Sequence, residues 1–538
     1  MNLNSLTIKN IRSIQEHTFR LKPLTLVVGA NSSGKSTFIR SFPLLRQSVE
    51  TITRGPVLWF GPYVDFGVFN DVVCRRSKVK EIEFSFDINL PTSRDFSDSF
   101  PLYFRRLNVL SNINATVSVV ISTPENDINT YTKRIELKIF NRTLTLHAKE
   151  DGEVTDVLID GHKIKSRRTT LSIKSGASLF AISQSTKDIS IKESNTPLPH
   201  SLFVGAFSDL IIDHMSVLFY HSTAIETKAE LYARLGLGDH ESMKVHLQAI
   251  SQFSSNSVKR RVKDYSENTT WLNRLQALIC ADKLPQILNE VDAFVSNVFL
   301  NVSYIKPLRA TAERFYRQQD LSVKEVDPQG ANLAMFLTGL KDTEKKQFSL
   351  WCNQNIGFSV KAVAVGSHVS IKLIDSNEGE EFNIADMGFG YSQLLPVLAA
   401  MWRSLSSGAI KHKDGLRSLR SNDILPKFIV VEQPELHLHP RLQGKFANLL
   451  ATLLNDEEDL NAKSSNTHII CETHSETIIN EIGLLISRGQ IKSQDVQVLL
   501  FDKKDDLMTD IRTSQYDKEG VLQNWPYGFF LPLNDDQE

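Results

Sequence analysis

The chain has 538 residues, of which 41% are hydrophobic and 23% charged, and its 61 Lys and Arg nearly balance 62 Asp and Glu. This length exceeds what one ordinary hydrophobic core supports, so we expect more than one domain or large subdomain. The net charge of −1 excludes nucleic-acid binding through overall charge, so such a contact would need a local patch. Because no run of eighteen apolar residues and no signal peptide occurs, we expect a cytoplasmic protein that does not enter a membrane.

The four cysteines lie far apart in the sequence, at Cys74, Cys280, Cys352 and Cys471. They form no Cys-x-x-Cys pair and have no histidine partners at the spacing of zinc ligands. We therefore expect four buried, reduced cysteines.

A glycine-rich segment follows the apolar run Leu24–Val28, which predicts a buried strand. A helical spacing of three and four follows it, at Phe38, Phe42, Leu45 and Val49. Between strand and helix lies GANSSGKST, that is Gly29, Ala30, Asn31, Ser32, Ser33, Gly34, Lys35, Ser36 and Thr37.

This order of strand, loop and helix predicts a loop that cradles nucleotide phosphates with backbone N–H groups. Lys35 would reach the terminal phosphates, and the Ser36 hydroxyl would bind Mg²⁺. The alternative is a flexible Gly/Ser turn. Because the flanking patterns fit the first interpretation, we expect Gly29–Thr37 to bind ATP or GTP with Mg²⁺.

Beyond this helix the sequence pattern changes along the chain. Alternating apolar residues predict an antiparallel sheet layer, and a helical periodicity without sustained heptads then predicts a compact helical insertion. Apolar residues on both sides of Gly366-Ser367 predict a hairpin that leads back to the nucleotide-binding part. The predicted parts are an N-terminal part with the phosphate loop, the β-rich layer, the helical insertion and a C-terminal part, at 1–80, 81–202, 203–350 and 351–538.

Two further apolar runs end in acidic residues. Phe428–Val431 predicts a central parallel strand buried on both faces, and Glu432 follows it. A carboxylate at the end of such a strand is where Mg²⁺ is held, usually through water, so Glu432 is the candidate. The run His468–Cys471 leads to His474, where a sensor of the γ-phosphate would lie, although a lone histidine after a strand is usually structural.

A third segment, Gly388, Phe389 and Gly390, opens the helix-like run Leu394–Trp402. Glycines at a helix N-terminus let the backbone approach a phosphate. Alone this pattern also fits an ordinary glycine-rich turn. Its position about forty residues before the acidic strand favours the phosphate-binding interpretation.

Together these segments resemble the ATP-binding-cassette ATPases, in the soluble branch that includes the chromosome-maintenance, RecF and OLD families. The resemblance implies an α/β P-loop ATPase head, here with an antiparallel β layer and a compact helical insertion. It also implies a signature at Met387–Tyr391, a Walker B strand ending at Glu432 and a switch histidine at His474. In that family the signature of one subunit completes the nucleotide site of another, which implies a homodimer around two ATP molecules.

Longer segments resemble a group of bacterial defence ATPases, the PtuA ATPases of Septu and retron systems. They are GPYVDFGVFNDVV from Gly61, YIKPLRATAERFY from Tyr304, GFGYSQLLPVL from Gly388, VVEQPELHLHP from Val430, CETHSETIINEI from Cys471 and NWPYGFF from Asn524. This resemblance implies an antiphage complex with a partner HNH nuclease and, in a retron, a reverse transcriptase and its small DNA. The rival is a RecF/SMC-like DNA-repair ATPase, whereas a transporter ATPase would be near half this length.

The Walker B segment departs from the commonest family pattern. Many members carry aspartate and then glutamate, whereas this chain has Glu432 and then Gln433. A glutamine can orient an attacking water but cannot accept its proton. Either hydrolysis is slow or Glu435 supplies the carboxylate; the alternative for Glu435 is a helix-start carboxylate that complements the helix dipole.

Two basic runs could contact nucleic-acid phosphates, although such runs are usually solvated faces. They are Lys163, Lys165, Arg167 and Arg168, and Lys259, Arg260, Arg261 and Lys263. Arg309 and Arg314 would either approach the nucleotide or the dimer interface or form structural ion pairs. No nuclease centre is expected, because Asp502, Asp505 and Asp506 do not form the Asp-x-Asp pattern of a Toprim nuclease and no HNH-like constellation occurs.

Overall fold

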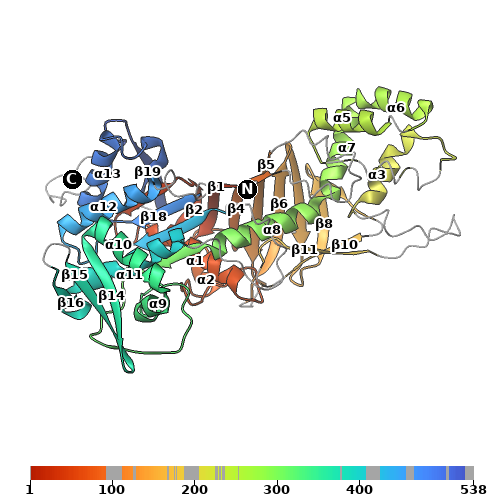
Figure 1. Ribbon diagram of the computed structural model, residues 1–538. Coiled ribbons are helices and arrows are strands. Elements are labelled where there is room, and N and C mark those ends of the chain that lie inside the picture. The colour runs from red at the N-terminus through yellow and green to blue at the C-terminus, as the bar shows by residue number, and fades with distance from the viewer. Residues whose placement is uncertain are drawn as a thin grey trace.

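The computed structural model describes residues 2–91, 112–124, 129–166, 169–174, 176, 178–186, 205–223, 228, 232, 235, 237–251, 254–375, 379–406, 425–455, 466–503 and 508–526. The molecule is elongated, with the C-terminal helices at one end and a separate group of helices at the other (Figure 1). None of the helices described is long and apolar enough to cross a membrane.

A seven-stranded sheet forms the C-terminal end, in the order β12-β17-β18-β3-β19-β20-β21. The first five strands are parallel, and β20 and β21 continue the sheet in antiparallel pairing. Their bounds are β3 Leu24–Gly29, β12 Val302–Ile305, β17 Lys427–Glu432, β18 Thr467–Glu472, β19 Val496–Lys503, β20 Thr509–Tyr516 and β21 Leu522–Gln523. All six residues of β3 and of β18 are buried, as expected for strands covered on both faces.

An eight-stranded antiparallel sheet extends from this end, in the order β2-β1-β4-β5-β6-β7-β8-β9. Its strands are β1 Asn2–Ile11, β2 Ile14–Arg20, β4 Glu81–Pro91, β5 Asn112–Ser122, β6 Tyr131–Ile139, β7 Arg142–Ala148, β8 Val154–Ile159 and β9 His162–Ile164. In β4 the alternate residues Ile82, Phe84 and Phe86 are fully buried, which is the period-two pattern of a sheet with one covered face. A separate pair, β10 Thr169–Ile173 and β11 Ile182–Thr186, lies near its far end (Figure 1).

The helix after the phosphate loop, α1 (Lys35–Glu50), shares one hydrophobic core with both large sheets. The ring of Phe38 stacks on Phe19 of β2 with centroids 3.9 Å apart, and the ring of Phe42 lies 5.3 Å from Phe428 of β17. The long helix α8 (Leu284–Leu300) packs along the same core and runs from the far end towards α1 (Figure 1). The helix that begins at the phosphate loop is thus fixed between the two sheets.

The opposite face of the parallel sheet is covered by a second hydrophobic core. Its helices are α9 Leu333–Gly339, α10 Asp342–Ile356, α11 Phe389–Ser406, α12 Pro440–Asn455 and α13 Glu476–Ser487. The predicted hairpin around Gly366-Ser367 is observed and is confirmed, as β14 Phe358–Val365 paired with β15 His368–Asp375. Short elements complete this end: β13 Tyr316–Arg317, β16 Glu381–Asn383, η5 Ile384–Asp386 and η6 Ser493–Asp495.

The far end has a core of its own, separate from the other two. It consists of α3 Ser208–Met215, η4 Ser216–Leu218, α5 His240–Ser251, α6 Asn256–Ser266 and α7 Thr269–Asp282. These helices form the compact helical insertion that the sequence predicts. One short helix, α2 Phe69–Val72, lies between α1 and β4 in the chain.

The four predicted parts were drawn from changes of pattern along the chain. Each of the two large sheets, however, contains strands from more than one of these parts. β1 from the first part pairs with β4 of the second, and β2 joins the same sheet through β1. β12 and α9, which fall within 203–350, belong to the sheet and core of the ATPase end, and α10 of the same core crosses the boundary at residue 350. A strand joins a sheet through partners that are distant in sequence, so local patterns do not reveal which part it belongs to.

Candidate nucleotide-binding site

Three strands from distant parts of the chain end side by side at one edge of the parallel sheet. β18 lies between β17 and β3, and Glu432 and Glu472 occupy paired positions at the ends of β17 and β18. Glu472 in turn pairs with Val27, two residues before Gly29. Since ligands of open α/β sheets bind at the carboxyl ends of the strands, this edge brings the phosphate loop and both acidic strand ends into one site.

The loop after β3 has the backbone shape of an anion cradle. Gly29 and Gly34 have φ angles of 147° and 102°, which residues other than glycine rarely adopt. A Cβ at Gly29 would overlap the carbonyl oxygen of Phe501, and one at Gly34 would overlap the side chain of Thr509. Thr509 Oγ1 donates to the Ser33 carbonyl at 2.8 Å and supports the loop. Helix α1 has no side-chain cap, so no side chain at its N-cap competes with a phosphate for its first N–H groups.

Lys35 is buried at the bottom of this cradle. Its Nζ donates to the carbonyl oxygens of Gly29 and Ala30 at 2.8 Å each and lies 3.7 Å from Glu472 Oε1. Burial lowers the pKa of Lys35, while Glu472 opposes this shift. An ammonium held by carbonyl groups beside an anion cradle fits the phosphates of a nucleotide.

Glu472 was not among the predicted site residues. Its side chain is almost fully buried, and its Oε1 lies 3.9 Å from Nε2 of His474. Burial and the nearby Glu432 raise its pKa to about 7, against the attraction of Lys35. The available signal was its place at the end of an apolar run, like Glu432, but only the strand order shows that it faces Lys35.

Glu432, the predicted magnesium ligand, is held by two side chains that the sequence did not connect with it. Arg40 Nε and Nη2 donate to its two oxygens at 2.9 and 2.8 Å, and the Tyr304 hydroxyl donates to Oε1 at 2.6 Å. A carboxylate has about four acceptor positions, so one remains on Oε2. The residues described contain no cluster of three acidic, His or Cys side chains suited to a metal, so Mg²⁺ would need Ser36, a water-mediated contact to Glu432 and phosphate oxygens.

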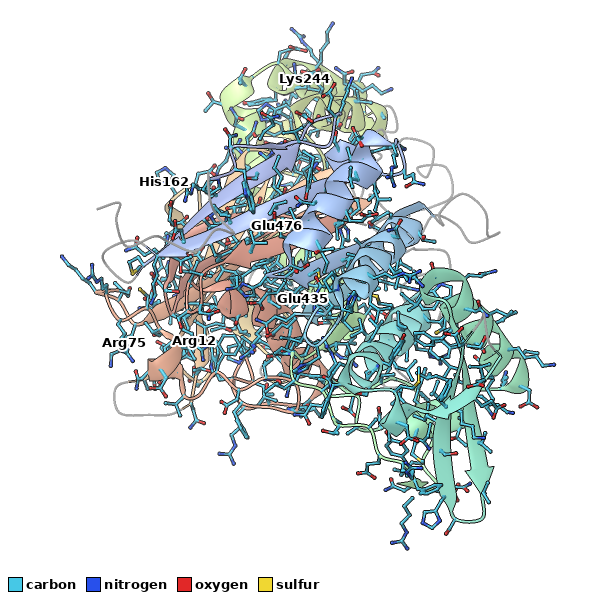
Figure 2. The ribbon with its side chains drawn as sticks, turned by 90° about the vertical axis from the view of Figure 1, so that its left-hand side faces the viewer. Arg12, Arg75, His162, Lys244, Glu435 and Glu476 are labelled. Atoms are coloured by element: carbon cyan, nitrogen blue, oxygen red, sulfur yellow. The ribbon has the colours of Figure 1, made fainter. Side chains whose placement is uncertain are left out.

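Gln433, Glu435 and His474 lie next to these carboxylates. The Gln433 N–H donates to the Glu472 carbonyl at 3.0 Å, and its φ of 44° is unusual for a residue with a side chain. Glu435 Oε1 accepts a hydrogen bond from the backbone N–H of His474 at 2.6 Å, which places it near the start of α13 (Figure 2). Burial raises the pKa of Glu435 and lowers that of His474, so the imidazole is mostly neutral near pH 7.

The predicted signature lies where α11 begins. Gly388 has a φ of 77° and open space where a Cβ would stand. A Cβ at Gly390 would lie 2.9 Å from the His437 carbonyl, so glycine permits close contact with the loop after β17. The Phe389 side chain is 62% exposed. The signature backbone is thus presented at the surface.

The other candidate residues have different surroundings. Arg314 forms an ion pair with Asp386 at 2.5 Å on the surface, whereas Arg309 is buried and donates to the Glu432 carbonyl at 2.9 Å.

The two basic runs differ in how far their side chains are engaged within the chain. Lys163 pairs with Asp156, and Arg261 donates to the Phe219 carbonyl at 2.7 Å. Three side chains of α6 are exposed: Lys259, Arg260 and Lys263. Asp502 pairs with Arg512, while Arg167, Arg168, Asp505 and Asp506 lie outside the described residues. All four cysteines are buried and free, as predicted.

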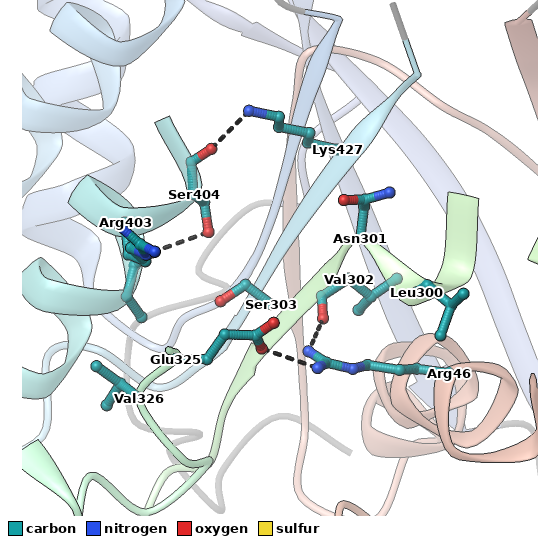
Figure 3. A pocket seen from close by; sticks show the side chains of 11 residues that line it. Arg46, Leu300, Asn301, Val302, Ser303, Glu325, Val326, Arg403, Ser404 and Lys427 are labelled. Atoms are coloured by element: carbon teal, nitrogen blue, oxygen red, sulfur yellow. Dashed lines mark hydrogen bonds and ion pairs between the residues drawn. The ribbon is translucent and has the colours of Figure 1, made fainter. Parts of the chain in front are cut away.

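A small cavity of about 40 Å³ lies at the amino end of the same sheet (Figure 3). Its lining includes Val302 and Lys427, the first residues of β12 and β17. Arg46 lines it and donates to Glu325 at 2.8 Å and to the Val302 carbonyl at 2.5 Å. A cavity of this size holds about one water molecule. It is therefore no rival to the site at the carboxyl edge.

The fold and the loop geometry define the class of the protein as an α/β P-loop ATPase of the ATP-binding-cassette type, which confirms the predicted fold. The chain belongs to the AAA ATPase domain family, which it matches over residues 1–479. Membership of this family supports ATP as the nucleotide.

Three solved structures are similar over almost the whole chain at low identity. The Smc head domain with an extended coiled coil, bound to the C-terminal domain of ScpA and derived from Pyrococcus furiosus, is 10% identical, with 95% of this chain and 96% of that chain covered and a TM-score of 0.33. The SMC head domain from Thermotoga maritima is 8% identical, with coverages of 95% and 98% and a TM-score of 0.34. The recombination mediator protein RecF with ATPrS is 10% identical, with coverages of 95% and 99% and a TM-score of 0.26. No curated protein matches the chain.

Proposed function

We propose that the chain binds and slowly hydrolyses ATP at the carboxyl edge of its parallel sheet. The observation that carries this proposal is the cluster at the end of the glycine cradle, where Lys35 Nζ and His474 Nε2 lie 3.7 and 3.9 Å from the same Glu472 oxygen. A lysine and a neutral imidazole around one carboxyl oxygen form a geometry that also suits an oxygen of a terminal phosphate.

In the proposed reaction a water attacks the γ-phosphorus, the bond to the β–γ bridging oxygen breaks, and the proton of the water passes to a carboxylate. Gln433 would orient this water, and Glu435 would accept its proton, because its raised pKa makes it a stronger base. Lys35 would neutralise charge on the terminal phosphates, and His474 would contact the γ-phosphate. Bound Mg²⁺, held by Ser36 and through water by Glu432, supplies further neutralisation of charge on the phosphate oxygens.

The proposed active form is a homodimer in which Gly388, Phe389 and Gly390 of one subunit complete the ATP site of the other. The exposed Phe389 and the open space at Gly388 support this role, because a signature must be accessible to a second subunit. ATP would then act as a clamp between two heads. The Gln433 substitution would keep the clamp closed for longer than in rapid ATPases.

We place this ATPase in a bacterial antiphage complex of the Septu or retron type, where it would regulate a partner HNH nuclease. The support is the sequence resemblance of segments spread from Gly61 to Asn524. A retron would add a reverse transcriptase and its small DNA. The alternative is a RecF/SMC-like DNA-repair ATPase, which fits the same nucleotide site.

Two experiments test these proposals separately. ATP and GTP binding and hydrolysis by the purified chain, with and without Mg²⁺, test the enzyme; no nucleotide binding would overturn it. Purification of the native complex tests the biological role, because an HNH protein or a reverse transcriptase with DNA supports defence. Replication-gap partners would instead support the repair ATPase.

A further inference from the structure

We propose that Arg309 is a positioning residue that connects the signature helix α11 to the carboxylate Glu435. This inference rests on the proposed function, in which Glu435 accepts the proton of the attacking water. Nothing in the sequence patterns distinguishes Arg309 from the exposed arginines near it. Its surroundings in the fold do.

The Arg309 backbone is joined to α11 by a reciprocal contact. Its N–H donates to Gln393 Oε1 at 3.3 Å, and the Gln393 amide donates back to the Arg309 carbonyl at 3.4 Å. Gln393 is buried one turn after the signature glycine Gly390, on the same helix. A shift of the start of α11 would therefore move Arg309.

The Arg309 guanidinium reaches the end of the Walker B strand. Nη2 donates to the Glu432 carbonyl at 2.9 Å and lies 3.5 Å from that of Gln433. The side chain is only 7% exposed, and burial lowers the pKa of Arg309 to about 10. It remains a cation at neutral pH in a place where a charge is costly.

Arg309 and Glu435 both have hydrogen-bonding groups without a partner, which indicates that Glu435 is the partner that the Arg309 cation would take. Nε and Nη1 of Arg309 are buried and make no hydrogen bond to any of the residues described. Oε2 of Glu435 is also buried and accepts no well-aligned hydrogen bond from the residues described, although the nearby Thr473 hydroxyl opposes the rise of the Glu435 pKa. The attraction of Glu435 is the largest that acts on the Arg309 cation. Two buried donors and one buried acceptor without hydrogen-bond partners favour a movement that joins them, because an unmet buried polar group is costly.

The other oxygen of Glu435 is already held by the His474 backbone N–H at 2.6 Å. Closure of the Arg309–Glu435 pair would fix both carboxylate oxygens and so fix the direction of the proton acceptor. Because Arg309 moves with α11, docking of the signature onto ATP of a second subunit would set this alignment. Hydrolysis at each of the two ATP sites would thereby require that both signatures are docked.

The experiment compares Arg309→Met, Arg309→Lys and Gln393→Leu with the matched control Arg317→Met, an exposed arginine on β13. We expect Arg309→Met to bind ATP within about threefold of wild type and to lower kcat at least tenfold. Arg309→Lys should recover part of kcat, because it restores a cation. Gln393→Leu should lower kcat by about threefold, and Arg317→Met should leave it unchanged.

The double variant Arg309→Met/Glu435→Gln separates positioning from a merely structural role. If Arg309 acts through Glu435, its kcat equals that of Glu435→Gln alone, whereas multiplied losses or an unchanged kcat in Arg309→Met would overturn the inference. If Arg309→Met does not fold, the double variant Gln393→Leu/Glu435→Gln is measured instead. Losses of kcat that multiply in this double variant would also overturn the inference. If the wild type hydrolysed ATP no faster than Lys35→Ala, the proposed function itself would be overturned.

Discussion

The two edges of the parallel sheet differ in how their buried and half-buried charges are paired. At the amino edge Arg46 pairs with Glu325, and Lys427 donates to the Ser404 carbonyl at 2.8 Å. At the carboxyl edge Glu472 lies near a second carboxylate, Glu432, and its nearest cation, Lys35, is beyond hydrogen-bonding distance at 3.7 Å. Charges at the amino edge stabilise the fold, whereas those at the carboxyl edge are balanced for a ligand that brings charge of its own.

The largest effect that follows from this contrast is the loss of nucleotide binding in Lys35→Ala. We expect the affinity for ATP to fall more than 100-fold, because the cation at the bottom of the phosphate cradle is removed. Titration with a fluorescent ATP analogue measures this. Lys427→Met, which removes a half-buried lysine from the amino edge, is the matched control and should bind ATP like the wild type. Equal losses in both variants would erase the distinction between the edges.

At the amino edge the corresponding effect is on stability. Arg46→Met removes the hydrogen bonds to Val302 and Glu325 and the stacking on the Tyr63 ring at 4.6 Å. We expect the free energy of unfolding to fall by about 2 kcal/mol, since the buried Val302 carbonyl loses its donor and the half-buried Glu325 loses its cation. Urea unfolding provides the measurement. ATP affinity of the folded variant should change less than threefold, and a loss as large as that of Lys35→Ala would contradict this division of roles.

A smaller effect concerns pH and Glu472. Its pKa is raised from 4.5 to about 7, so the folded state binds a proton that the unfolded state has lost between these values. Its contribution is therefore favourable below about pH 4.5 and is lost as pH rises through 7. We expect Glu472→Gln, which cannot ionise, to gain about 2 kcal/mol of unfolding free energy relative to wild type between pH 5 and pH 8.

Urea unfolding at both pH values measures the difference. Glu519→Gln, at an exposed position of the turn before β21, is the control and should follow the wild type at each pH. A pH-independent difference for Glu472→Gln would mean that Glu472 is ionised throughout and that Lys35 compensates its burial fully.

Local features of the site could be read from the chain, and contacts across the sheet could not. The glycine positions of the phosphate loop, the buried strands at Leu24–Val28 and Phe428–Val431, and the hairpin at Gly366-Ser367 follow from short-range patterns. The Arg40–Glu432 pair joins residues 392 positions apart, and Tyr304 reaches the same carboxylate from an edge strand. No pattern in one segment carries information on a partner so distant.

The sequence by itself determined the phosphate loop, because the backbone conformation of the loop depends on neighbouring residues, and the resemblance of its motifs indicated the class of protein. It also placed Glu432, Gln433, Glu435 and His474 at strand ends. Only the tertiary structure decided which charges meet there, since that depends on the order β17-β18-β3 and on the packing of α11 against it. Glu472 beside Lys35 and Arg309 near Glu435 are consequences of this order.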